Sequence, residues 1–210
     1  MSFFEGRIFN FLNKLANLIV LNILWVVCSL PIITIGPATT AGYYTALKLV
    51  EDEGDSVIKM YFRSFKRNFK QAFVLGIIFT IIGGVLCFDI YLCTNKLQAE
   101  NSFKLIMLAL LIFILLIFVV EMLYLWSLLS KFDNTNKQTV INAFVLSVNN
   151  YKKTVIMLVQ DIAIITVGVI CVAFVPQIAV LFFIFGVSLI FYANSTILRP
   201  ILQDLAEKTI

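Results

Sequence analysis

Long apolar runs constrain this chain more than any other feature. The longest run covers residues 104–129. After Lys104, Glu121 is its only charged residue over about 25 positions. Because a helix rises about 1.5 Å per residue, roughly 20 residues cross a hydrocarbon core about 30 Å thick. Four further runs lie at residues 16–35, 72–92, 155–175 and 177–198. The sequence therefore predicts five long membrane-spanning helices.

The composition agrees with a membrane protein and excludes several kinds of chemistry. Hydrophobic residues make up 61% of the 210 residues and charged residues 13%, which predicts a single integral membrane domain over residues 1–210. The chain has no histidine, the commonest metal ligand and general base near neutral pH. Its four cysteines form no CxxC pair, and no hydrolase, zinc-protease or P-loop motif is present. We therefore expect no catalytic residue, no metal and no cofactor.

Residues 31–50 predict a short embedded helix rather than a sixth full span. Pro31 and the Gly36-Pro37 pair interrupt helices, and residues 38–50 make a helix only about 20 Å long. Their Ala, Gly and Thr content favours contact with other helices over contact with lipid. We expect this segment to re-enter and return the chain to its side of origin, with a full span as the alternative.

The basic residues favour the returning arrangement, because Lys and Arg concentrate on the cytosolic side of membrane helices. If the segment returns, all 16 Lys and Arg residues except Lys96 and Lys104 lie in the cytosol. If it does not, the two basic residues before the first span move outside. The predicted fold is thus an all-α polytopic membrane helix bundle built as three hairpins. We expect it in the plasma membrane with both termini in the cytoplasm.

Polar residues inside the predicted spans form a candidate intramembrane site of Glu121, Asp161 and Asn194. An ionisable residue in a span costs roughly 2.5–3.5 kcal/mol on insertion scales, so each needs a reason. Glu121 and Asp161 lie at similar depths. If they meet, they share a proton or hold a cation. If they do not, each bonds to a polar neighbour and joins two helices.

Two further groups of residues are candidates for function. A broken helix beside a cavity is typical of transporter binding sites, so one polar face is either a solute path or a packing face. That face comprises Thr39, Thr40, Tyr43 and Tyr44.

Residues 56–70 form an amphipathic segment that lies either in the lipid headgroup layer or against a partner protein. Its basic side comprises Lys59, Arg63, Lys66, Arg67 and Lys70. No motif indicates nucleic-acid binding.

Much of the N-terminal third resembles the YesL-like family of bacterial membrane proteins. The resembling stretches are FLNKLANLI (11–19), LNILW (21–25), CSLPIITIGPATTA (28–41) and FRSFKRNFKQA (62–72). The strong part covers residues 8–72. This resemblance implies a multi-pass protein of Gram-positive bacteria. It also implies a gene that lies beside those for oligosaccharide ABC importers and polysaccharide-degrading enzymes. The family brings no established functional residues.

Two functions are therefore expected. The first is an accessory, assembly or regulatory membrane subunit of an oligosaccharide ABC uptake system, in contact with lipid and with ABC permease subunits. The alternative is a small solute or ion transporter or channel that uses the intramembrane carboxylates and works as a homo-oligomer.

Overall fold

The computed structural model describes residues 2–53, 55–96, 101–174 and 176–209, and all regular structure in them is helical. The helices are α1 (Ser2–Ser29), η1 (Ile32–Thr34), α2 (Ile35–Val50), α3 (Val57–Asn95), α4 (Asn101–Lys131), α5 (Asn136–Asn149), α6 (Tyr151–Phe174) and α7 (Pro176–Thr209). By length and composition, α1, α3, α4, α6 and α7 are able to cross a membrane. The predicted all-α class and the predicted long spans are confirmed.

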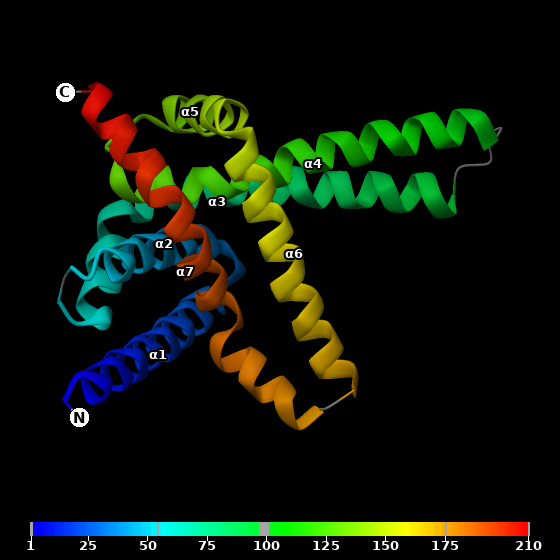
Figure 1. Ribbon diagram of the computed structural model, residues 1–210. Coiled ribbons are helices and arrows are strands. Elements are labelled where there is room, and N and C mark those ends of the chain that lie inside the picture. The colour runs from blue at the N-terminus through cyan, green and yellow to red at the C-terminus, as the bar shows by residue number, and fades with distance from the viewer. Residues whose placement is uncertain (1, 54, 97–100, 175, 210) are drawn as a thin grey trace.

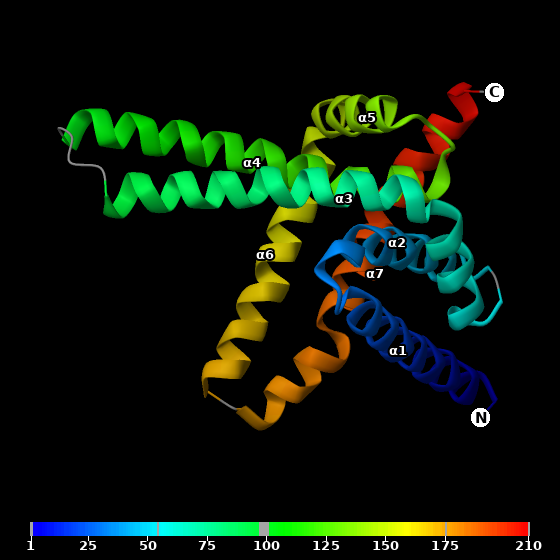
Figure 2. The ribbon, with the colours of Figure 1, turned by 180° about the vertical axis from the view of Figure 1, so that it is seen from behind.

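The helices pair as three hairpins, α1–α2, α3–α4 and α6–α7, as predicted (Figure 1). All three meet around α2, which packs against α1, α3, α4 and α7. Away from this centre the hairpins diverge. The α3–α4 hairpin extends to the right in Figure 1 and the α6–α7 hairpin extends downwards, and the view from behind agrees (Figure 2). The outer halves of these helices therefore have few helical neighbours.

Helix α2 turns the chain back along α1, which fits both a re-entrant segment and a short full span. Lys14 Nζ in α1 lies 2.9 Å from Asp52 Oδ1, which follows the end of α2. This ion pair places the end of α2 beside the first half of α1. Helix α1 ends at Ser29, earlier than the predicted span end at residue 35. Pro31 explains the difference, because proline disfavours helical geometry in the residue before it.

Small residues allow α2 to lie at the centre of the molecule. A Cβ atom on Gly36 would meet the carbonyl oxygen of Ala72 in α3, and one on Gly42 would meet the Phe191 ring in α7. Ala38, Ala41 and Ala46 are fully buried. Such residues let helix backbones approach closely, which supplies packing where lipid removes the hydrophobic drive.

Helix α3 contains two segments that the sequence analysis predicts as separate elements. The amphipathic residues 56–70 and the predicted span 72–92 lie on one continuous helix, Val57–Asn95. Its side facing the protein includes buried Ser64 and Asn68, whereas Phe62 and Phe69 are exposed. Lipid explains this arrangement, because large apolar side chains gain little by turning away from an apolar solvent.

Candidate functional site

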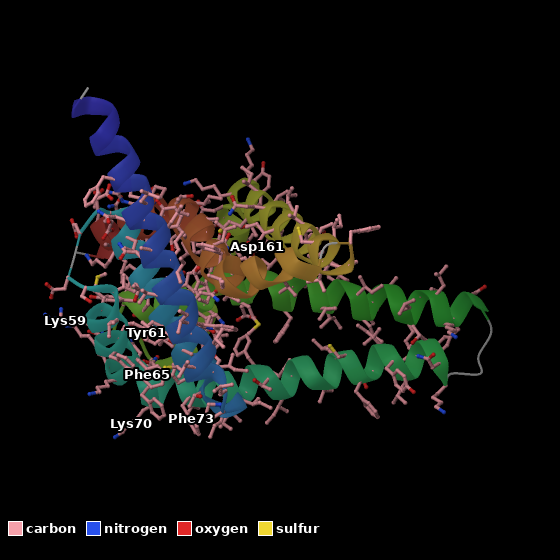
Figure 3. The ribbon with its side chains drawn as sticks, turned by 90° about the horizontal axis from the view of Figure 1, so that it is seen from below. Lys59, Tyr61, Phe65, Lys70, Phe73 and Asp161 are labelled. Carbon is pink, nitrogen blue, oxygen red and sulfur yellow. The ribbon has the colours of Figure 1, made fainter. Side chains whose placement is uncertain are left out.

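Three polar side chains from three helices meet inside the molecule: Tyr43 of α2, Asp161 of α6 and Asn194 of α7. Asn194 Nδ2 donates to Asp161 Oδ2 at 3.0 Å and to Tyr43 Oη at 3.4 Å. Asn194 is fully buried, and Tyr43 is nearly so. Figure 3 labels Asp161 on the α6–α7 hairpin, among the packed helices. This polar cluster ties the two later helices to the central α2.

The polar cluster contains buried acceptor atoms whose hydrogen-bonding capacity is not satisfied. Within the described part of the chain, Asp161 Oδ1 and Asn194 Oδ1 have no hydrogen-bond partner. The neighbouring Gln160 Nε2 and Ser195 Oγ are buried and unpartnered too. An unmet buried polar group costs about 1–3 kcal/mol, so these acceptors favour uptake of a proton, a water molecule or a small cation. Among the described residues, no three His, Cys, Asp or Glu side chains gather as a metal site.

Glu121 lies apart from the polar cluster. It lines an apolar groove of about 550 Å³ between α3, α4 and α5, together with Leu75, Phe79 and Lys137. Glu121 Oε1 is buried without a hydrogen-bond partner among the described residues. Sequence reasoning joined Glu121 to Asp161 by their similar depth. Depth gives the height of a residue along a span but not its direction around the helix axis.

The polar face of α2 makes packing contacts throughout. Thr39 accepts from Trp25 Nε1 at 3.2 Å, and Thr40 donates to the Gly36 carbonyl at 3.0 Å. The Tyr43 ring lies 4.9 Å from the Phe191 ring, and Arg67 lies 5.5 Å above the Tyr44 ring. Of the two alternatives for this face, a solute path or packing, these contacts favour packing.

Sequence reasoning missed Asn22, which joins α1 to α7. Asn22 Oδ1 accepts from the backbone N–H of Val187 at 3.1 Å and of Ser188 at 3.0 Å. Helix α7 bends in Figure 1, and insertion of a side chain into the backbone ladder is a known cause of helix bending. An asparagine inside an apolar run was the available signal.

The five basic residues of the amphipathic segment are all exposed. Figure 3 shows Lys59 and Lys70 at the edge of the molecule, with Tyr61 turned inward. Arg63 lies 3.7 Å from Asp55. Arg67 differs from the others, because its Nη2 donates to the Ser130 carbonyl of α4 at 2.5 Å. The segment thus presents a basic surface, while Arg67 also fastens α3 to α4.

Among the residues that the structure describes, five helices long and apolar enough to cross a membrane, with many large apolar side chains exposed along them, define a class: a polytopic all-α membrane protein. Residues 18–90 match the family model described as "Protein of unknown function, DUF624". The chain is 25% identical over 203 residues to the uncharacterized protein YesL of Bacillus subtilis (strain 168), which covers 95% of this chain and 87% of that protein. These matches show that the chain is similar to YesL and, over residues 18–90, to the DUF624 family. No solved structure matches the chain.

Proposed function

We propose that this protein is an accessory or assembly subunit of an oligosaccharide ABC uptake system in the plasma membrane. In this proposal both termini face the cytoplasm, on the ground that Lys and Arg concentrate on the cytosolic side of membrane helices. The observation that carries the proposal is the exposure of the diverging hairpins. In the apolar 18-residue windows that qualify α4 and α6 as spans, only 6% and 11% of the residues are buried within the chain.

Exposed span surfaces offer binding faces for other membrane helices. One groove of about 520 Å³ lies between α1, α6 and α7 and is lined by Trp25, Gly168 and Ala173 among others. Small residues of this kind admit a close partner helix. The implied gene neighbourhood of the YesL-like family points to an ABC permease as that partner. The exposed basic side of α3 supplies a second contact at the membrane surface, with headgroups or with the permease.

Co-purification in mild detergent tests the accessory role. The tagged full-length chain should retain a permease at a fixed ratio, and deletion of its gene should lower oligosaccharide uptake. Ala173→Leu fills the groove and should release the permease. Ala163→Leu adds the same bulk to an exposed position of α6 outside the groove and should not. Absence of any permease, together with unchanged uptake in the deletion strain, would refute the accessory role.

A transporter or channel is the second candidate, and the unpartnered Asp161 Oδ1 favours it. In this account the polar cluster exchanges a proton or cation during transport, and the chain works as a homo-oligomer. Protein reconstituted in vesicles should then move a solute or an ion, and Asp161→Asn should abolish the flux. Glu121→Gln removes the other deep carboxylate, which lies outside the cluster, and should leave the flux intact. Vesicles that move neither solute nor ion would rule this candidate out.

A further inference from the structure

The end of the molecule where α2 and α4 finish contains a polar cavity of about 270 Å³. Four basic side chains and two acidic ones line this charged cavity. They are Lys48 of α2, Arg67 of α3, Lys131 of α4 and Arg199 of α7, with Glu51 and Glu53. The four basic residues come from four different helices, so the fold assembles the cavity from distant parts of the sequence.

The two acidic residues are already paired with the two lysines. Glu51 lies 3.1 Å from Lys48 and 4.0 Å from Lys131, and Glu53 lies 2.8 Å from Lys48. The hydrogen bond from Lys48 lowers the pKa of Glu53, and the charges of Arg199 and Lys131 lower it further. Glu53 is therefore ionised at neutral pH. With four basic and two acidic side chains, the cavity lining carries an excess of positive charge.

Neither arginine forms an ion pair with a residue that the structure describes. Arg67 is held in place by the Ser130 carbonyl and by the ring of Tyr44. Arg199 Nε is buried and has no hydrogen-bond partner among the described residues. A buried donor without an acceptor is unfavourable, and a bound anion would supply the acceptor that Arg199 lacks.

We propose that the charged cavity binds a phosphate group through Arg67 and Arg199, with Lys48 and Lys131 adding positive charge. A guanidinium group presents a planar fork of donors that matches phosphate oxygens, and Tyr44 already orients one of the two forks. The phosphate belongs either to the headgroup of an anionic lipid or to a soluble phosphate ester, which share this chemistry. The inference goes beyond the accessory role and does not depend on a permease.

The test uses the full-length chain in nanodiscs of neutral phosphatidylcholine. In one arm phosphatidic acid is added to the discs, and bound lipid is counted by native mass spectrometry. In the other arm glycerol 3-phosphate is added to the solution, and the melting temperature is followed. We expect saturable one-to-one binding in at least one arm, weakened at least about tenfold by Arg199→Gln and by Arg67→Gln. Binding in the lipid arm alone identifies a headgroup, and binding in the soluble arm alone identifies an ester.

Matched variants keep the test decisive. Lys66→Gln removes one positive charge from α3, next to Arg67, but from an exposed side chain outside the cavity, so binding should persist. Arg199→Lys retains the charge and should weaken binding less than Arg199→Gln. Elution profile and helix content identify a variant that misfolds, and the Arg199 pair then decides the outcome without Arg67→Gln. Absence of binding in both arms, or equal losses for Lys66→Gln and Arg199→Gln, would overturn the proposal.

Discussion

At the residue scale, the helix crossings depend on a few very small or polar side chains. Gly36 and Gly76 let α2 and α3 touch, and Asn22 supplies acceptors to the backbone of α7. Inside lipid, close backbone contact and hydrogen bonds between helices hold the bundle together, and large apolar side chains supply neither. Substitution of these small or polar residues should therefore affect stability more than the substitution of large exposed residues.

Gly36→Ala should destabilise the protein by about 1–3 kcal/mol, because the added Cβ meets the Ala72 carbonyl and overpacks the α2–α3 crossing. Thermal melting of the purified protein in detergent measures the effect. Gly84→Ala in α3 is the matched control, since a Cβ there meets nothing within 4 Å. Equal melting temperatures for the Gly36 variant and the wild type would contradict the close crossing.

Asn22→Leu should also destabilise the protein, because it leaves two backbone donors of α7 without their acceptor at about 1–3 kcal/mol for each unmet group. Hydrogen exchange at Val187 and Ser188 should accelerate along with the loss of thermal stability. Asn13→Leu changes an exposed asparagine of the same helix and should alter neither. Unchanged exchange at both amides would show that Asn22 does not support the bend.

At the element scale, the sequence predicts the helices well and their facing sides poorly. Run length, the proline breaks and the composition of residues 38–50 correctly give the long spans, a short helix α2 that turns back along α1, and the three hairpins. Whether α2 re-enters the membrane or spans it stays a prediction. The separation of Glu121 from Asp161 could not be predicted, because both lie in helices that are apolar on all sides. In water an apolar stripe would fix which side is buried. In lipid that rule fails, as the exposed Phe62 and Phe69 show.

A cross-linking test addresses the α1–α2 hairpin directly. In a chain whose four native cysteines are replaced by serine, a short bis-maleimide reagent should join Lys14→Cys to Asp52→Cys, because the reagent replaces the length of the two native side chains, which meet in an ion pair. Lys14→Cys with Lys104→Cys should stay uncross-linked within one chain, since α1 and α2 do not reach the far end of the α3–α4 hairpin (Figure 2). The reverse pattern would mean that α2 does not return.

At the scale of the whole molecule, basic residues lie at two opposite ends. One end contains the charged cavity and holds Lys14, Lys48, Lys131 and Arg199, of which the first three form ion pairs with Asp52 or Glu51. Lys104 lies at the opposite end of the α3–α4 hairpin, where its Nζ donates to the Thr94 carbonyl at 2.8 Å. This charge distribution supports the proposal that the basic end faces the cytosol, because Lys and Arg concentrate on that side of membrane helices.

Labelling of single cysteines in intact cells is the most direct measurement of this account. In the cysteine-free chain, Lys66→Cys and Lys152→Cys should both be protected from a membrane-impermeant thiol reagent until the cells are opened. Lys96→Cys should react in intact cells. Residues 66 and 152 found on opposite faces of the membrane would contradict the three-hairpin arrangement. The proposed cytosolic position of the two basic loops would then fall with it.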